Sequence, residues 1–328
     1  MTNSLNRLRR IVSDNLCHRC GSCSGICPKN VLRPDDEYYP NWEGRESDCT
    51  DCGLCVKVCS GTGFSFPEYS RRMFGREETV ADKHGLYIKA FLSHTTDPEL
   101  RSNSTSGGLG TELPRYLLRS GRAKGAFSVG FDKDHPWKPA AFIARGEDEL
   151  RMGSYSKYPV CAINHLFGEI RDDQGPFVYT GLPCHLHGLI KMSELDRKIG
   201  EKIALTVGLY CHSCLEHQAL MDMMSIYGIS ETEVTGMNYR SGKLPGYVRA
   251  QTKDGAGVTI PYPSTHPDGY RPNAKEVLTL FFKLYSPKRC RLCVDAMADF
   301  ADIAIGDPWI RGWEAVDKLR LGYNLVIA

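Results

Sequence analysis

The sequence predicts a chain of the α/β (α+β) class with two domains. A small cysteine-rich domain and its linker are expected in residues 1–78, and a mixed α/β domain in residues 79–328. Three observations support this prediction. A chain of 328 residues is long enough for two domains. Eight of the 14 cysteines lie within the first sixty residues, and strand-like runs alternate with helical patterns from residue 86 onward.

Composition excludes several classes of protein. With 41% hydrophobic residues, 24% charged residues and no long apolar stretch, a transmembrane role is not expected. Polar residues and cysteines follow Arg7, Arg9 and Arg10, so no secretory signal is predicted and we expect a cytoplasmic protein. The net charge of +2 offers no electrostatic footprint for nucleic acid or anionic lipid. Cysteines in a reducing compartment favour metal or cluster ligation over disulfides.

Two cysteine runs share the spacing C-x2-C-x2-C-x3-C. The first run, which Pro28 follows, comprises Cys17, Cys20, Cys23 and Cys27. The second run comprises Cys49, Cys52, Cys55 and Cys59. This is the bacterial spacing for 4Fe-4S cluster ligands, and its repetition predicts a two-cluster ferredoxin-type domain. Zinc is the alternative for such cysteines, but structural zinc takes four ligands per ion and rarely uses this three-plus-one run.

The fourth cysteine of each run is expected to serve the other cluster, as it does in two-cluster ferredoxins. One cluster is therefore assigned to Cys17, Cys20, Cys23 and Cys59. The other cluster is assigned to Cys49, Cys52, Cys55 and Cys27. Gly21 and Gly53 lie between the second and third cysteines, where a missing side chain lets backbone N–H groups approach the sulfurs. Ser60 follows Cys59 where proline is expected, which is a departure at that turn.

Residues 61–83 are predicted to be a linker that contains the domain boundary. Gly61, Gly63 and Pro67 fall in this segment, which shows no sustained hydrophobic periodicity. The basic residues of the segment are Arg71, Arg72 and Arg76. They are interpreted as solvated surface residues. The alternative is that they stabilise the negatively charged clusters.

The larger domain is predicted to contain strands and helices in alternation. Strands are expected at residues 86–92, 126–131, 177–180, 204–210 and 301–305. Between residues 109 and 118, Leu109, Leu113 and Leu117 keep helical spacing, which predicts a helix.

The segment before this helix, residues 104–108, reads Ser-Thr-Ser-Gly-Gly. Such a start presents unpaired N–H groups at a positive dipole end, which suits a phosphate or the electron-rich edge of a flavin. Most glycine-rich helix starts are structural, so the segment alone does not decide between these roles. No G-x-G-x-x-G follows a strand, so a Rossmann nicotinamide site is not supported.

The remaining cysteines are widely separated. They are Cys161, Cys184, Cys211, Cys214, Cys290 and Cys293. Their spacing allows a four-thiolate site assembled from three loops, with the C-x2-C pair Cys290 and Cys293 as its clearest element. Buried free cysteine is the alternative for all of them, and it is favoured for Cys161 and Cys214.

Several motifs together resemble one known family. Beside the tandem cysteine runs they are residues 106–108 (Ser-Gly-Gly), 156–158 (Ser-Lys-Tyr), 181–184 (Gly-Leu-Pro-Cys), 208–211 (Gly-Leu-Tyr-Cys), 290–293 (Cys-Arg-Leu-Cys) and 301–307 (Ala-Asp-Ile-Ala-Ile-Gly-Asp). Over nearly its whole length the chain resembles the family of coenzyme F420 hydrogenase/dehydrogenase beta subunits. That family includes the flavin subunits of F420-dependent hydrogenase and dehydrogenases, and the plant 7-hydroxymethyl chlorophyll a reductase. The resemblance implies FAD beside a 4Fe-4S cluster.

Residue roles follow from this resemblance. The residues that match the family's cluster ligands are Cys184, Cys211, Cys290 and Cys293, which leaves Cys214 as a spare. The residues expected to bind FAD are Ser106, Gly107, Gly108, Ser156, Lys157, Tyr158, Thr180 and Gly181. Lys157 is expected to place positive charge near the flavin, and His185, where the family often has glutamine, is a candidate proton donor. The alternatives are a solvated lysine and a packed histidine.

The expected function is that of an iron-sulfur flavoprotein oxidoreductase subunit. Electrons would pass between a two-electron partner, coenzyme F420 by resemblance, and one-electron carriers through FAD and the clusters. One alternative is a ferredoxin-dependent reductase of a small organic substrate, and another is a flavin-free electron-transfer subunit. Expected partners are other redox subunits or ferredoxin, together with a deazaflavin or small organic substrate. The sequence stops at residues 325–328, within a strand-like run. We therefore expect that the chain lacks a C-terminal portion.

Overall fold

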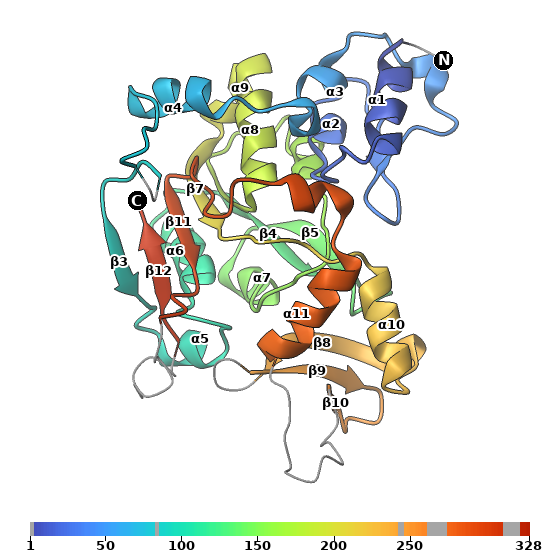
Figure 1. The fold of residues 1–328 in the computed structure, drawn as a ribbon, viewed down its shortest axis with the longest axis vertical. Coiled ribbons are helices and arrows are strands. Elements are labelled where there is room, and N and C mark those ends of the chain that lie inside the picture. The colour runs from blue at the N-terminus through green and yellow to red at the C-terminus, as the bar shows by residue number, and fades with distance from the viewer. Residues whose placement is uncertain (1–2, 83–84, 242–245, 261–273, 311–321) are drawn as a thin grey trace.

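A computed structural model describes residues 3–82, 85–241, 246–260, 274–310 and 322–328. The N-terminal part forms a small module with little regular structure (Figure 1). Its elements are α1 (Asn3–Ser13), α2 (Ser22–Gly25), β1 (Arg33–Pro34), β2 (Pro40–Asn41), η1 (Glu46–Asp48), α3 (Leu54–Lys57) and η2 (Ser60–Thr62). The short helices and the loops beside them carry the cysteine runs, and α1 covers them with its apolar face, on which Leu5, Leu8 and Ile11 are buried.

The segment predicted to be a linker contains a helix. Helix α4 spans Phe66–Phe74, with Pro67 in its first turn and Gly75 in a left-handed conformation at its C-terminal end. These two residues are start and stop signals for a helix, which the lack of sustained hydrophobic periodicity had not indicated. The Tyr69 hydroxyl donates a 2.8 Å hydrogen bond to Glu194, which fastens α4 to the larger domain.

The larger domain is built on a seven-stranded mixed sheet with the strand order β3-β12-β11-β7-β6-β4-β5. The strands are β3 (Ala90–Ser93), β4 (Gly125–Phe131), β5 (Pro139–Ala144), β6 (Phe177–Gly181), β7 (Ile203–Leu209), β11 (Ile303–Gly306) and β12 (Asn324–Ile327). The four central strands β11, β7, β6 and β4 run parallel, and β12 and β5 flank them in antiparallel orientation. The mixed α/β class is confirmed, and all five predicted strands are present, although the first begins only at Ala90.

Side chains alternate between the two faces of this sheet, as the pleat requires. Phe127 and Tyr179 point to one apolar cluster, whereas Ala126 and Val178 point to the cluster on the opposite face. Helix α8 (Pro183–Leu195) covers the first face, and α6 (Leu109–Arg119) covers the second, where the sequence predicted a helix. The shorter helices around the sheet are α5 (Pro98–Ser102), α7 (Glu147–Met152), η3 (Ile163–Gly168) and α9 (Arg197–Glu201).

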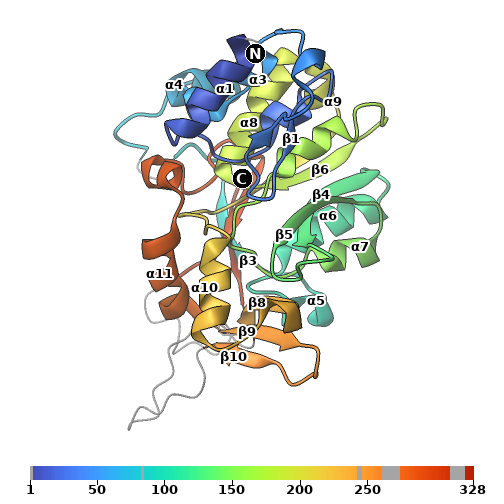
Figure 2. The ribbon, with the colours of Figure 1, turned by 90° about the vertical axis from the view of Figure 1, so that its right-hand side faces the viewer.

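A second sheet lies at the opposite end of the molecule from the module (Figure 2). It is antiparallel and consists of β8 (Val234–Ser241), β9 (Tyr247–Thr252) and β10 (Val258–Ile260). Helices α10 (Gln218–Ile226) and α11 (Ala274–Tyr285) pack on it around a separate apolar core, and η4 (Glu231–Glu233) leads into it. From α11 the chain returns toward the module through η5 (Lys288–Leu292), which carries a cysteine of the C-x2-C pair.

The module and the larger domain share one apolar core. Ile26 and Val58 of the module are buried in the same cluster as Phe127 and Leu186. The backbones also meet closely, because a Cβ atom at Gly25 would lie 2.1 Å from the carbonyl oxygen of Asn164 in η3. Glycine is therefore required where the module packs against the domain.

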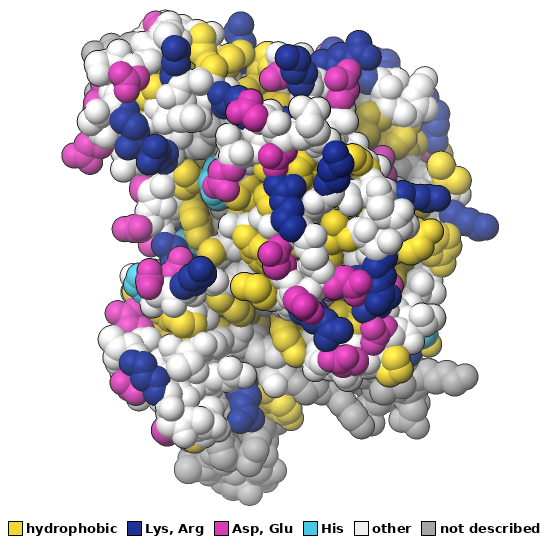
Figure 3. All heavy atoms as spheres, turned by 180° about the vertical axis from the view of Figure 1, so that it is seen from behind, with side chains coloured by type: hydrophobic (Ala, Val, Ile, Leu, Met, Phe, Trp, Pro, Cys, Tyr) yellow, Lys and Arg dark blue, Asp and Glu magenta, His cyan; other side chains and the backbone are white. Residues whose placement is uncertain are grey.

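The surface carries no dominant charge. Figure 3 shows basic and acidic side chains interspersed over the rear face, in keeping with the small net charge of the chain. Among the described residues, no helix is both long and apolar enough to cross a lipid bilayer.

Candidate functional site

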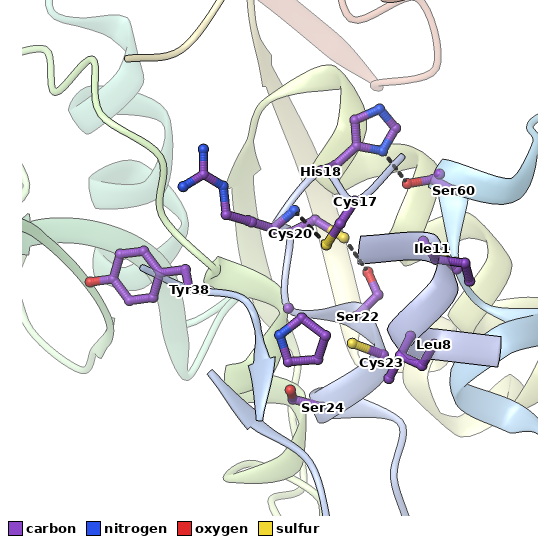
Figure 4. A pocket seen from close by; sticks show the side chains of 15 residues that line it. Leu8, Ile11, Cys17, His18, Cys20, Ser22, Cys23, Ser24, Tyr38 and Ser60 are labelled. Carbon is purple, nitrogen blue, oxygen red and sulfur yellow. Dashed lines mark hydrogen bonds between the residues drawn. The ribbon is translucent and has the colours of Figure 1, made fainter. Parts of the chain in front are cut away.

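The first pocket of the module collects four thiols from both cysteine runs. Cys17, Cys20, Cys23 and Cys59 line it together with His18, Ser22 and Ser60 (Figure 4). This is the set that the exchange of fourth cysteines predicted. Burial raises the pKa of the Cys17 thiol to about 12, and the neighbouring thiols of Cys20 and Cys59 contribute to this rise.

The second pocket contains the complementary set. Its thiols belong to Cys27, Cys49, Cys52 and Cys55. Burial raises the pKa of Cys55 to about 12, with contributions from the other three thiols, whereas Cys52 is exposed at the surface. The two pockets therefore differ in depth, and the second one reaches the outer surface of the module.

The donors in both pockets fit 4Fe-4S clusters. Each pocket brings four thiols together, and thiolate is the ligand type that such clusters use. Burial is the main cause of the raised pKa of the Cys17 and Cys55 thiols, and a bound cation would reverse this effect by favouring thiolate. The backbone N–H of Arg19 also donates to Cys17 Sγ at 3.3 Å, a contact that tunes cluster potentials. Among the described residues, no three His, Cys, Asp or Glu side chains lie close enough together to bind a single metal ion.

A third group of thiols lies in the larger domain. Cys184 stands in the first turn of α8, Cys211 follows β7, and Cys290 and Cys293 lie in and after η5. The pKa of the Cys184 thiol is raised first by burial and then by the thiols of Cys214, Cys20, Cys290 and Cys293. The thiols of Cys184, Cys290 and Cys293 thus lie within electrostatic range of one another and of Cys20 in the first module pocket.

The structure adds Cys214 to this group. The sequence favoured a buried or spare thiol at this position, and Cys214 is indeed buried, with the thiols of Cys211 and Cys290 as its neighbours. Its spacing of two residues from Cys211 repeats that of Cys290 and Cys293, which is the signal that could have indicated it. The larger domain therefore presents five thiols in one place.

A large pocket of about 620 Å³ borders the third thiol group, and Cys211 and Cys214 form part of its wall. Its volume falls within the range of roughly 300–1,000 Å³ that is typical of cofactor and ligand sites. The predicted flavin contacts that line it are Ser106, Gly108, Ser156, Lys157, Tyr158, Thr180 and Gly181. His185 lines it as well. Gly107 does not, because it packs against Asn324 of β12 and the carbonyl of Ser93.

Lys157 and His185 both make polar contacts, and His185 is buried whereas Lys157 is half-buried. Lys157 Nζ donates to the carbonyl oxygens of Gly153 and Ser154 at 2.9 and 2.5 Å, and burial lowers its pKa to about 7. His185 Nδ1 accepts a 3.2 Å hydrogen bond from the backbone N–H of Leu182, so it caps the N-terminus of α8. Burial lowers the pKa of His185 to about 4, and the imidazole is therefore neutral near pH 7.

Two buried hydroxyls in the wall of the large pocket indicate a ligand. Within the described part of the chain, Thr180 Oγ1 and Tyr210 Oη have no hydrogen-bond partner. Buried polar groups are rarely left in this state, because an unmade hydrogen bond costs free energy. The Tyr210 ring lies against the backbone of Gly306, where a Cβ atom would come within 2.0 Å of it. Sequence patterns did not single out Tyr210 as a contact.

Arg240 brings a second cationic group to this pocket. It pairs with Asp307, and its guanidinium lies 5.3 Å from the centre of the Trp309 ring. All three residues line the pocket on the side of the second sheet. The wall is thus apolar for the most part, with a few polar and charged groups, as in other cofactor sites.

Three family profiles match the chain. The N-terminal profile of the coenzyme F420 hydrogenase/dehydrogenase beta subunit matches residues 90–167, and its C-terminal profile matches residues 176–328. The profile of a 4Fe-4S dicluster domain matches residues 16–61. The chain belongs to the family of coenzyme F420 hydrogenase/dehydrogenase beta subunits. The resemblance noted in the sequence is confirmed.

Several relatives of this beta-subunit homologue come from Methanocaldococcus and Methanosarcina species. It is 25% identical to the coenzyme F420-dependent sulfite reductase of Methanocaldococcus jannaschii over 92% of its own length, and spans 43% of that protein. It is 22% identical to a subunit of the F(420)H(2) dehydrogenase of Methanosarcina mazei, covering 94% of this chain and 81% of that one. A chain of the F420-reducing [NiFe] hydrogenase complex from Methanosarcina barkeri shares its fold, with a TM-score of 0.55, 22% identity, and coverage of 74% and 75% of the two chains.

These findings place the beta-subunit homologue among iron-sulfur oxidoreductases that transfer electrons. The 4Fe-4S profile covers both cysteine runs, so the prediction of 4Fe-4S clusters in the ferredoxin-type module is confirmed. The assignment of individual cysteines to clusters stays a prediction, and so does the assignment of individual residues to a flavin site.

Proposed function

We propose that the chain is an FAD-containing subunit that exchanges electrons between a two-electron deazaflavin partner, coenzyme F420, and one-electron carriers. The observation that supports this most is that the large pocket, the thiol group of the larger domain and the first module pocket are neighbours. Cys211 and Cys214 belong to the wall of the 620 Å³ pocket, and Cys184 of the same thiol group adjoins Cys20 of the module. A cofactor-sized pocket that borders one thiol group, which in turn lies near a second group in the module, suits the conversion of paired electrons into single ones.

FAD is proposed for the large pocket because the residues there fit it. The pocket has sufficient volume, and the glycine-rich turn before α6 brings the N-terminus of an eleven-residue helix to its wall. The unpartnered hydroxyls of Thr180 and Tyr210 supply hydrogen-bonding groups that a flavin or its ribityl and phosphate groups can satisfy. When bound, FAD supplies the exchange between two-electron and one-electron chemistry.

Lys157 is proposed to act on the charge of the site. Its ammonium group is desolvated, and the two carbonyl oxygens that it contacts hold it in the pocket wall. A protonated lysine there stabilises a developing negative charge on a reduced ligand, and a neutral lysine does not. His185 is proposed to position Cys184 and the start of α8. Its Nδ1 atom accepts a hydrogen bond from the backbone N–H of Leu182, which fixes the first turn of that helix.

Three clusters are proposed for the chain. Two lie in the ferredoxin-type domain of residues 1–78, with the exchanged ligand sets described above. The third lies in the FAD domain of residues 79–328, and its four ligands are drawn from the five thiols there. We propose Cys184, Cys211, Cys290 and Cys293, with Cys214 beside the sulfurs of Cys211 and Cys290.

The proposed partners follow from the relatives. Their names include an F420 hydrogenase beta chain, a component of F(420)H(2) dehydrogenase and an F420-dependent sulfite reductase. We propose that this chain likewise takes F420 as its two-electron partner. Other redox subunits or ferredoxin would then exchange single electrons with the clusters.

The first test is anaerobic purification of the full chain with iron, sulfide and flavin measured per chain. We expect about twelve irons for three 4Fe-4S clusters and about one FAD. Reduced F420 should then reduce a viologen dye through the protein. Full iron and flavin loading without this activity, but with flavin reduction by ferredoxin, would replace F420 by the ferredoxin-dependent reductase alternative. Full iron loading without any flavin would favour a flavin-free electron-transfer role.

A further inference from the structure

Three residues form a hydrogen-bonded bridge between the module and the larger domain. Arg289 Nε lies 3.0 Å from His18 Nε2, and His18 Nδ1 lies 3.1 Å from Ser60 Oγ (Figure 4 shows the second contact). Arg289 comes from η5, whereas His18 lies in the loop before α2 and Ser60 is the first residue of η2. The bridge therefore joins segments that are far apart in the sequence.

Each member of the bridge is the direct neighbour of a proposed cluster ligand. His18 follows Cys17, Ser60 follows Cys59, and Arg289 precedes Cys290. The first two cysteines belong to the first module pocket, and the third belongs to the thiol group of the larger domain. Neither contact involves the second module pocket.

The direction of the hydrogen bonds assigns the tautomer of His18. Arginine only donates, so His18 Nε2 must accept from Arg289 Nε and carry no proton. In the neutral ring the proton is then on Nδ1, which donates to Ser60 Oγ. Both ring nitrogens are occupied, and Ser60 is buried.

We propose that Arg289, His18 and Ser60 hold the loop of Cys290 against the loops of Cys17 and Cys59, so that electrons cross between the domains at this pair of clusters. His18 and Arg289 are positioning residues in this proposal, and the second module cluster, which reaches the surface at Cys52, serves partners outside the chain. This inference rests on the proposed three-cluster function but not on FAD or F420.

The transfer that the bridge serves moves one electron. One cluster is oxidised and the other is reduced, and no bond is formed or broken. Proton release is not required, because both nitrogens of His18 keep their hydrogen bonds throughout. The role of the bridge is to set the separation and contact of the two loops, on which the rate of electron exchange depends.

The test uses the anaerobically purified full chain and the methyl viologen radical as a one-electron donor. Rapid-freeze electron paramagnetic resonance follows the appearance of each reduced cluster. In the Arg289→Gln variant we expect a several-fold slower appearance of the larger-domain cluster, with unchanged reduction of the module clusters. Arg291→Gln is the matched control, because Arg291 is an exposed arginine two residues away. An Arg289→Gln protein that holds all its iron and reduces at the wild-type rate would overturn the proposal.

A second pair of variants separates this role from folding. In His18→Gln the side-chain oxygen can accept from Arg289 and the amide can donate to Ser60, so we expect the rate to be largely retained. In His18→Leu neither contact is possible, and we expect the slow rate at full iron content. Equal rates in the two variants, both with full iron, would contradict a bridge. Since neither flavin nor F420 takes part, failure here is distinct from failure of the proposed function.

Discussion

The ring of Phe64 stacks on the imidazole of His187, with ring centroids 3.9 Å apart and planes 14° apart. Phe64 lies in the segment that leaves the module, and His187 lies in α8 of the larger domain. Tyr69 also stacks on Phe64, with centroids 4.2 Å apart, and Phe300 meets it edge-on at 5.0 Å. His187 is fixed in turn by a 2.9 Å contact with the buried carboxylate of Asp295. This aromatic cluster fastens the connecting segment to the domain.

Replacing Phe64 with alanine should loosen this segment. We expect a loss of about 2 kcal/mol in stability, roughly half the cost of deleting a fully buried phenylalanine, because Phe64 is only half-buried. Limited proteolysis should cut the variant faster within residues 64–82. Met73→Ala is the control, since Met73 is 44% exposed. Equal cleavage of the two variants would argue against a fastening role for the aromatic cluster.

The exchange of fourth cysteines between the runs can be tested by two single variants. Cys59→Ser should disturb the cluster of Cys17, Cys20 and Cys23, and Cys27→Ser should disturb the other one. Potentiometric titration followed by electron paramagnetic resonance should show a different signal changed in each variant. If Cys59→Ser altered the same signal as Cys52→Ser, each run would instead supply all four ligands of its own cluster.

Cys214 is expected to tune the third cluster without ligating it. Its thiol contacts those of Cys211 and Cys290, and hydrogen bonds to ligand sulfurs stabilise the reduced state. Cys214→Ala should therefore retain iron and lower the reduction potential of that cluster. Cys293→Ala, by comparison, should lose the cluster. A Cys214→Ala protein that lost about four irons would make Cys214 a ligand.

The burial of Lys157 predicts a pH dependence of stability. Its pKa in the folded chain is lowered to about 7 from an ordinary value of about 10.5, so the unfolded chain binds more protons between these values. The cost of burying the ammonium group is fully present below about pH 7 and disappears as the pH rises toward about 10. The apparent melting temperature of the wild type, compared with that of Lys157→Met, should therefore rise over this interval. A constant difference between the two proteins across it would show that Lys157 titrates normally.

Gly306 is predicted to be indispensable for the shape of the large pocket. A methyl group at this position would overlap the ring of Tyr210, so Gly306→Ala should displace that ring and cost about 1–3 kcal/mol. We expect a weaker affinity for FAD, measured by the flavin retained after dialysis. Gly146→Ala is the control, because nothing lies within 4 Å of the position of its added Cβ atom. Undiminished flavin retention in Gly306→Ala would place the flavin away from Tyr210.

Much of the site could be predicted because local spacing encodes it. The two cysteine runs, α6 and the central strands all follow from short patterns of residues, and the structure contains each of them. Other features depend on contacts between distant segments, which spacing does not reveal. Asn324 accepts a hydrogen bond from the N-terminus of α6 across more than two hundred residues, and Tyr210 meets Gly306 only through the pairing of β7 with β11. The second sheet was likewise absent from the prediction.

The close approach of Gly25 to Asn164 has a consequence for how the chain handles electrons. A module whose backbone touches that of its host cannot swing on its tether like the carrier arms of multienzyme complexes. Its metal centres are instead held at fixed distances from the larger domain. Electron transfer within the chain therefore requires no movement of the module, and its rate should not depend on solvent viscosity. Only encounters with outside molecules then depend on concentration.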